Sequence, residues 1–233
     1  NELEYKLRSE QEAAVKMTLD YAETHQGGEF LWNAKPRFGK TLSTYDLARR
    51  MKAKKVLIVT NRPAIASSWF DDFENYVAWQ TTFRFVSTTE TLKERPVLSR
   101  EEFEKELIEK DLIENSDDEY LGCITFISLQ DLKGAISFGG FIDKLKWVKD
   151  LKWDLLVIDE AHEGVDTFKT DIAFNNISRD FTLHLSGTPF KAVASGRFSQ
   201  SQIFNWTYAD EQDAKAAWSE DSEENNPYEG LPR

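Results

Sequence analysis

The sequence has very little cysteine and no long hydrophobic run. Its 233 residues include one cysteine, Cys123, which excludes a disulfide framework and fits a reducing cytoplasm. Cys123 lies in the apolar run GCITFISL, where we expect a buried core residue. No apolar run reaches membrane-spanning length, and the N-terminus lacks the pattern of a signal peptide. A starting methionine is also absent, and we expect the chain to be a piece of a longer protein.

Basic residues are outnumbered, but the acidic excess is local. The net charge is −12, from 29 Lys and Arg against 41 Asp and Glu. Residues 99–120 carry ten acids and three bases, and residues 209–229 carry eight acids and one base. The rest of the chain has 23 acids and 25 bases, so it can present a basic face to nucleic acid. We interpret the two acidic stretches as solvated surface.

Internal repeats and Pro-rich or Gly/Ser-rich linkers are absent, and short apolar runs alternate with amphipathic segments. The apolar runs predict strands at 29–34, 55–60, 82–87, 123–128, 153–160 and 181–188. Helical spacing predicts a helix after a capping box at Ser9 and Glu12, and others over 41–51, 64–77, 141–149, 167–177 and the aromatic tail 203–218. This alternation is typical of an α/β domain whose mostly parallel sheet has helices on both faces. Ligands of such sheets bind at the carboxyl ends of the strands.

One of these expected strand ends leads into NAKPRFGKT, which finishes like a phosphate-binding loop. Such a loop needs inward-facing backbone N–H groups, a lysine for the terminal phosphates and a hydroxyl for Mg²⁺, and Gly39, Lys40 and Thr41 supply its closing half. The usual pattern has glycine at Ala34 and often at Arg37. Alanine is tolerated if its backbone angles are ordinary. Arg37 must hold ordinary angles or turn its side chain outward, and we expect it to point away from the phosphates.

A second strand end carries two adjacent carboxylates in the sequence VIDEAH. Charged groups directly after a buried strand are costly unless they serve chemistry there. Asp159 is placed to hold Mg²⁺ through water opposite Thr41, and Glu160 to orient or deprotonate an attacking water. His162 lies just beyond, where it can sense the γ-phosphate. The alternative is an acidic helix N-terminus, but the order and spacing of the two motifs favour a site for ATP and Mg²⁺.

Together these motifs resemble the first RecA-like motor domain of superfamily-2 DEAD/DEAH helicases and translocases, over nearly the whole chain. LRSEQEAAV is similar to the family's adenine-reading segment, AKPRFGKT to motif I, VLIVTNRPAIASSWFDDF to motif Ia, ITFISLQDL to the next strand-end motif, VIDEAH to motif II and LSGTPF to motif III. The forms PRFGKT and LSGTPF look most like the restriction-enzyme and phage-defence branch. The resemblance implies a RecA-like P-loop fold, ATP and Mg²⁺ as cofactors, and nucleic acid as partner, with DNA favoured over RNA.

The resemblance also implies roles for individual residues. The catalytic group would be Lys40, Asp159, Glu160 and His162, with Thr41 and Asp159 also holding Mg²⁺. The nucleotide would contact Arg8, Gln11 and the loop residues Ala34, Lys35, Pro36, Arg37, Phe38, Gly39, Lys40 and Thr41. Ser186 and Thr188 would couple the nucleotide to nucleic acid, and the nucleic-acid backbone would be contacted by Asn61, Arg62 and Ser128.

Plainer interpretations of some of these residues stay open. Gln11 can be an ordinary helix N-terminal glutamine, and Arg62 and Ser128 can be plain loop residues. His25 and His184 match no motif, and we expect a surface histidine and a strand histidine respectively.

The domain organisation that we expect is a motor domain at residues 1–205 and an acidic helical exit at 206–233. In the family, a second RecA-like lobe brings arginines to the γ-phosphate, and this chain has no segment for one. We therefore expect ATP hydrolysis by the full-length protein and almost none by this chain alone. An RNA helicase lobe and a nucleotide-binding interaction module without motor action are the alternatives.

Overall fold

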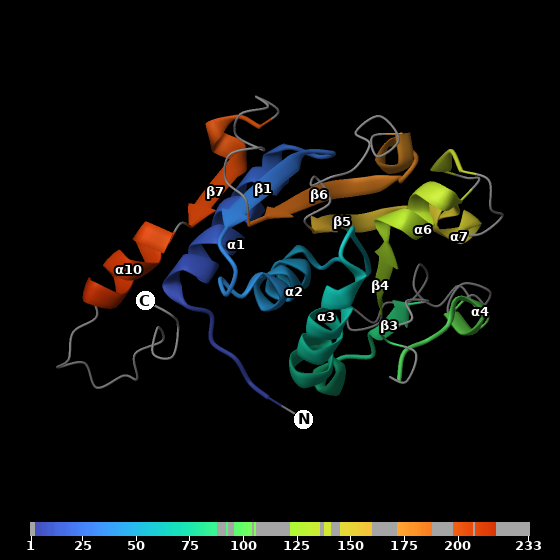
Figure 1. Cartoon of the computed structure of the whole chain (residues 1–233), viewed down its shortest axis with the longest axis horizontal. Helices are drawn as coiled ribbons and strands as arrows, with labels where there is room; N and C mark the ends of the chain where they lie inside the picture. Colours follow the sequence, from blue (N-terminus) through green and yellow to red (C-terminus); the bar gives the residue numbers. More distant parts are fainter. Residues whose placement is uncertain are drawn as a thin grey trace.

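The computed structural model describes residues 3–87, 92, 96–103, 105, 122–135, 138–140, 145–159, 172–187, 198–206 and 208–217 (Figure 1). Seven strands form one sheet in the order β3-β4-β2-β5-β6-β1-β7, and every pairing is parallel. The strands are β1 (Glu29–Ala34), β2 (Lys55–Thr60), β3 (Arg84–Ser87), β4 (Cys123–Ser128), β5 (Trp153–Asp159), β6 (Arg179–Ser186) and β7 (Ile203–Trp206). The predicted α/β fold with a parallel sheet is confirmed.

Helices cover both faces of the sheet. The longer ones are α1 (Ser9–Thr24), α2 (Lys40–Met51), α3 (Ala66–Asp72) and α10 (Tyr208–Ala217), and the shorter ones are α4 (Arg100–Phe103), α6 (Leu129–Gly134) and α7 (Lys146–Asp150). Successive β2 residues alternate between the faces: Val56 and Ile58 belong to the core cluster that includes α1, α2 and α3 residues, and Leu57 and Val59 to the cluster with α6 and α7. Strands buried on both faces explain the unbroken apolar runs. Cys123 is buried in the second cluster, as predicted.

The first helix is held against the second by charged side chains. Arg50 of α2 pairs with Glu12 of α1 (Nη2–Oε2 2.5 Å) and with Asp46 one turn away (Nε–Oδ2 2.8 Å). The Tyr5 hydroxyl donates to the other Asp46 oxygen at 2.6 Å, which fixes the segment before α1. These contacts place the N-terminal end of α1, and the segment before it, beside the second half of α2.

Three sequence-based expectations need correction or refinement. The residue that precedes α1 is Arg8, not Ser9; the Gln11 side chain accepts from the Arg8 N–H at 2.8 Å, so the predicted Ser9–Glu12 capping box is wrong. The helical run 64–77 is present, but it comprises a 3₁₀ turn, α3 and a wider π turn. Residues 203–206, expected to be helical, form β7, because they pair with β1 at the sheet edge.

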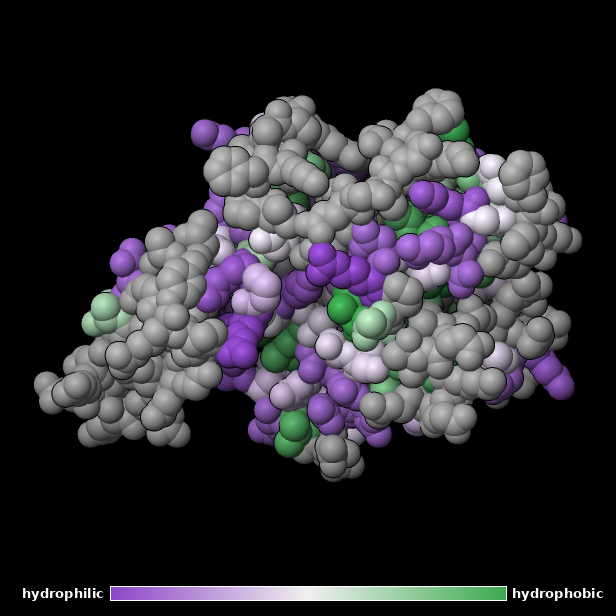
Figure 2. All heavy atoms as spheres, viewed as in Figure 1, coloured by the Kyte–Doolittle hydropathy of each residue, from purple (hydrophilic) through white to green (hydrophobic). Residues whose placement is uncertain are grey.

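Two predicted helices are described only in part. The structure places helix at 146–150 and 172–175, while residues 145, 176 and 177 are described and are not helical. Residues 141–144 and 167–171 of the two predicted segments lie outside the described residues. In the part of the chain that is described, no helix has the length and apolarity to cross a membrane. On the face drawn in Figure 2, the described surface is largely hydrophilic. Over all described residues, the large hydrophobic side chains that are exposed are Leu3, Met17 and Trp79.

Candidate nucleotide-binding site

The carboxyl ends of five neighbouring strands bring most of the predicted site residues to one edge of the sheet. In the strand register, Thr60 is opposite both Ser128 and Asp159. Asn33, the residue before Ala34, is opposite Ser186. The loop after β1 therefore lies on the same edge as the end of β5, which is where open parallel sheets bind ligands.

The loop after β1 closes on a glycine that cannot be replaced freely. Gly39 has φ +83° and directly precedes α2, and a Cβ at this position would overlap the Gln11 amide. The first turn of α2 is then stabilised by the Ser43 N–H and hydroxyl, which donate to the Gly39 carbonyl at 3.1 and 2.8 Å. Lys40 and Thr41 thus begin a helix whose N-terminal dipole favours an anion.

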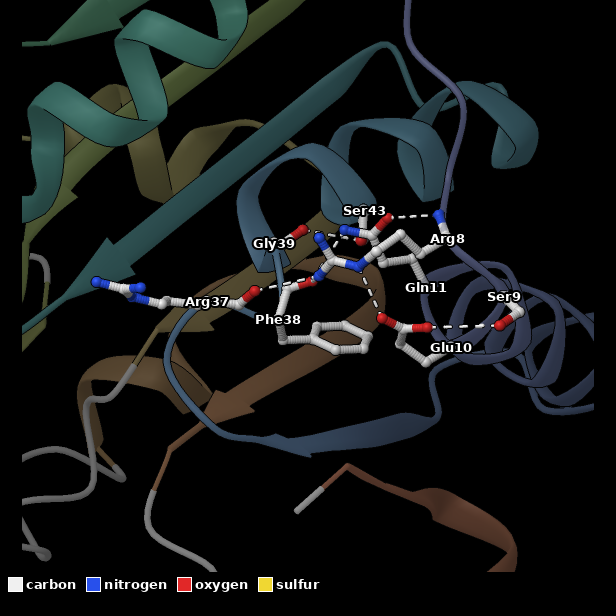
Figure 3. Close-up of polar contacts among 8 residues, drawn as sticks. All are labelled: Arg8, Ser9, Glu10, Gln11, Arg37, Phe38, Gly39 and Ser43. Atoms are coloured by element: carbon white, nitrogen blue, oxygen red, sulfur yellow. Dashed lines mark hydrogen bonds and ion pairs between the residues drawn. The ribbon is translucent and has the colours of Figure 1, made fainter. Parts of the chain in front are cut away.

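The two departures from the usual loop pattern have different solutions. Ala34 is buried, and its φ is not positive, so alanine meets no steric cost there. Arg37 adopts φ +74°, the left-handed angle that glycine would provide. Its side chain is exposed and extends away from Arg8 and Gln11 in Figure 3. Of the two options for Arg37, the loop therefore keeps the glycine-like backbone and turns the side chain outward.

This angle makes loop stability testable. Left-handed angles cost a residue with a Cβ about 1–2 kcal/mol. Glycine avoids this strain, but it loses about 0.5–1 kcal/mol more backbone conformational entropy when the chain folds. We expect Arg37→Gly to keep or raise the free energy of unfolding in urea. Arg37→Val should lower it by about 1–2 kcal/mol, because β-branched residues tolerate this region least. If the glycine variant were less stable than the valine variant, the side chain rather than the backbone would determine stability at this position.

Lys40 and Asp159 contact each other across the site. Lys40 Nζ lies 2.7 Å from Asp159 Oδ1, although the two residues are 119 positions apart. The other carboxylate oxygen, Oδ2, accepts from the Trp69 indole N–H at 3.1 Å. Asp159 is fully buried, so both of its oxygens need such donors. The lysine and the aspartate of the two predicted motifs are thus brought together.

Thr41 is also held by a carboxylate. Its hydroxyl donates a short hydrogen bond to Asp72 Oδ2 at the end of α3. Burial raises the pKa of the Asp72 carboxyl, and the hydrogen bond from Thr41 opposes this shift. Neither Asp72 nor Trp69 was singled out as a site residue from the sequence. The available signal was WFDDF, in which the indole and the second carboxylate are three residues apart on one predicted helix.

Arg8 and Gln11 contact the loop itself. Gln11 Nε2 and Arg8 Nη2 each donate to the Phe38 carbonyl at 2.8 Å, and Arg8 Nη2 also donates to the Arg37 carbonyl at 3.1 Å (Figure 3). Glu10 orients the guanidinium through its Oε1, 2.7 Å from Arg8 Nε. Gln11 therefore does two things: its side-chain oxygen caps the N-terminus of α1, which is the plainer interpretation given above, and its side-chain nitrogen binds the loop after β1.

The remaining predicted residues are placed as follows. Lys35 is half-buried and Pro36 exposed, while the Phe38 ring is buried against Trp32. Exposed Arg62 and half-buried Asn61 follow β2, and half-buried Ser186 ends β6. The buried Ser128 hydroxyl accepts from the Asp131 N–H at 3.1 Å, so it caps α6. Glu160, His162 and Thr188 lie outside the described residues. His25 is exposed and His184 is buried in β6, as expected.

The oxygen groups at this edge fit Mg²⁺ better than a transition metal. Thr41 supplies a hydroxyl and Asp159 a carboxylate, which are the hard ligands that Mg²⁺ prefers. Among the described residues there is no group of three or more His, Cys, Asp or Glu side chains that could cage a metal. Mg²⁺ does not need such a cage, because nucleotide phosphates and water complete its coordination.

This chain is similar to known proteins in sequence and in fold. A putative type II restriction enzyme and methyltransferase of Mycoplasma pneumoniae, RM.MpnORF110P C-terminus, is 26% identical over 255 residues, covering 91% of this chain and 33% of its own length. This chain therefore spans about a third of that relative.

The fold is similar to that of two solved DNA complexes. A nuclease-deletion mutant of the Type ISP restriction-modification enzyme LlaGI with a DNA substrate mimic has a TM-score of 0.61 at 16% identity, over 93% of this chain and 21% of that one. The Sulfolobus solfataricus SWI2/SNF2 ATPase core with dsDNA has a TM-score of 0.54 at 16% identity, over 85% and 36%.

These similarities agree with the resemblance to superfamily-2 motors. Residues 4–191 match the family described as "Type III restriction enzyme, res subunit", a helicase-like ATPase family, and this segment contains every predicted site residue. The match includes the phosphate loop, the end of β5 and the end of β6, which the fold brings to one edge. The chain therefore belongs to the family of type III restriction enzyme res subunits.

Proposed function

We propose that this chain is the first ATP-binding lobe of an ATP-dependent DNA translocase or helicase in a restriction-modification or phage-defence system. The observation that carries the proposal is the 2.7 Å ion pair between Lys40 of the phosphate loop and Asp159 at the end of β5. In P-loop NTPases the loop lysine contacts the terminal phosphates, and a carboxylate at a strand end helps to hold the Mg²⁺ that bridges them. Membership in a helicase-like ATPase family supports the same chemistry.

In this proposal the Lys40 ammonium exchanges Asp159 for the terminal phosphates when ATP binds. Thr41 and Asp159 would hold Mg²⁺, which when bound offsets negative charge on the phosphates. Glu160 orients or deprotonates the attacking water, and His162 senses the γ-phosphate. Because Arg8 and Gln11 hold the loop carbonyl of Phe38, the same residues can link the nucleotide base to the phosphate loop.

Nucleic acid would bind along the same strand ends. Asn61, Arg62 and Ser128 would contact the backbone, and Ser186 and Thr188 would couple it to the nucleotide. Gln130 Nε2 donates to the Asn61 carbonyl at 3.4 Å, so the segment after β2 contacts the first turn of α6, which follows β4. Backbone contacts of this kind give affinity without sequence specificity and weaken steeply with salt.

The parent protein would supply what this chain lacks. We propose that a second RecA-like lobe follows in the parent, that the protein works in the cytoplasm, and that residues beyond the motor domain form the exit towards that lobe. The expected boundary after residue 205 falls inside β7, whose last residue is Trp206, so we propose that the exit begins after this strand.

The ATPase activity of the full-length parent tests the choice of nucleic acid. We expect duplex DNA, but not RNA, to stimulate hydrolysis, and the stimulation to fall with salt. Stimulation by RNA alone would favour the RNA helicase alternative. ATP binding without turnover under any of these conditions would favour the interaction module.

A single substitution tests the water-activating role. In the parent, Glu160→Gln should keep nucleotide affinity and lower kcat by about two to four powers of ten, because the amide cannot accept the proton. Glu163→Gln, which removes an equal charge three residues later, should leave kcat near the wild-type value. Unchanged steady-state hydrolysis by Glu160→Gln would assign the role to another residue.

A further inference from the structure

Helix α3 touches both of the side chains that the proposed site uses for the metal. The Trp69 indole N–H donates to Asp159 Oδ2 at 3.1 Å, and Asp72 accepts the hydrogen bond of the Thr41 hydroxyl. Trp69 and Asp72 are three residues apart, a spacing that puts them on the same side of a helix. One short helix thus contacts the end of β5 and the start of α2 together.

This helix is fixed firmly enough to orient other groups. The Tyr45 hydroxyl of α2 donates to the Trp69 carbonyl at 2.6 Å, and the two rings pack edge to face with centroids 5.6 Å apart. Trp69 and Tyr45 are both buried, so neither contact competes with water. Thr41 and Tyr45 are one turn apart on α2, and both meet α3.

The direction of each hydrogen bond suits a cation. A threonine hydroxyl has one proton and two lone pairs, and with the proton given to Asp72 the lone pairs stay available to a metal. An indole N–H is a donor only, so Trp69 fixes one oxygen of Asp159 and leaves the other facing Lys40 and the phosphate loop. Outer carboxylates that orient metal ligands in this way change metal affinity by about 10–100-fold.

From this geometry we infer that Asp72 and Trp69 are positioning residues that orient Thr41 and Asp159 for Mg²⁺ bound with the nucleotide. The inference rests on the proposed function, because it needs a nucleotide and Mg²⁺ at this edge of the sheet. It differs from that function in assigning a task to α3, the helix that begins shortly after the proposed nucleic-acid residues Asn61 and Arg62. Asp72 also adds a negative charge close to where the cation would bind.

The opposite interpretation is that Asp72 withholds Thr41 from the metal. In that case removing the carboxylate would free the hydroxyl, and Mg²⁺ would strengthen nucleotide binding more than in the wild type. The two interpretations predict changes of opposite sign, so one measurement separates them.

The measurement is the affinity of the full-length parent for fluorescently labelled ADP, with Mg²⁺ and with EDTA. The quantity of interest is the factor by which Mg²⁺ tightens binding. In Asp72→Ala we expect this factor to fall by about 10–100-fold, with the affinity in EDTA close to that of wild type. Asp72→Asn keeps an acceptor oxygen for Thr41 and should recover part of the factor. Trp69→Phe, which keeps the ring and removes the N–H, should lower it less than Asp72→Ala.

Matched controls separate this inference from folding and from the proposed function. Asp71→Ala removes an equal charge from the neighbouring position and should leave the Mg²⁺ factor unchanged. Damage to the fold would weaken binding in EDTA as well, and thermal unfolding of the nucleotide-free variants would reveal it. If wild type binds no ADP, the proposed function fails. If wild type binds ADP and Asp72→Ala keeps or increases the Mg²⁺ factor, only the role of α3 is overturned.

Discussion

Replacing Lys40 with alanine is expected to remove measurable binding of ATP and ADP in titration calorimetry. The ammonium lies at the N-terminal end of α2, 2.7 Å from Asp159 Oδ1 at the end of β5. Removing it takes away the charge that would meet the terminal phosphates and leaves the buried Asp159 carboxylate facing them. Both changes act against an anionic ligand.

The same substitution should weaken the fold, and the two effects can be separated. Breaking a fully buried pair costs about 3–5 kcal/mol, but the Lys40 side chain is 28% exposed, so we expect about 1–3 kcal/mol after allowing for screening. The double variant Lys40→Ala with Asp159→Asn removes the unpaired charge and should recover stability without recovering binding. Lys35→Ala, in the same loop, should weaken binding far less. Equal nucleotide affinity of wild type and Lys40→Ala would refute the site.

The chain on its own is expected to hydrolyse ATP about 10³ to 10⁵ times more slowly than the parent protein, the contribution of an arginine finger in phosphoryl transfer. Lys40 and Mg²⁺ offset only part of the charge on the transferring phosphoryl group. Arg8 donates to loop carbonyls, and Arg49 and Arg50 pair with Asp46, so these arginines are engaged elsewhere. An arginine from a second lobe would supply the missing charge.

An ATPase assay of the 233-residue chain, with and without duplex DNA, checks this expectation. In the same assay, the wild-type parent gives the highest expected rate of ATP hydrolysis, and its Glu160→Gln variant gives the rate of an inactivated site. DNA-stimulated turnover by the isolated chain near the parent rate would mean that an arginine of this chain completes the site. Arg37, exposed on the loop, and Arg197, outside the described residues, would be the first to replace.

Periodic segments and motif residues were predictable, whereas contacts made by the tertiary fold were not. The strands β2, β4 and β5 have apolar side chains on both faces, a pattern that the sequence displays directly. β7 has four residues, and its aromatic run IFNW suits a strand or a helix equally, so pairing with β1 decides its form. Lys40, Asp159 and Gln11 are recognisable from their motifs. Trp69 and Asp72 were not identified, because their roles depend on tertiary packing. Trp69 becomes a donor to Asp159 only when α3 packs against β5, and Asp72 an acceptor for Thr41 only when α3 packs against α2.

The place of β1 in the sheet determines when the site can form while the chain is being synthesised. β1 carries the phosphate loop, but its neighbours β6 and β7 follow it by about 150 and 170 residues. At about 5–20 residues per second, the ribosome needs about 8–30 s to make that intervening length. Through that interval β1 has no strand partner, and Lys40 lacks Asp159 until β5 is complete. The site residues synthesised first are therefore the last to become competent, and nascent chains gain affinity for nucleotide only as this domain nears completion.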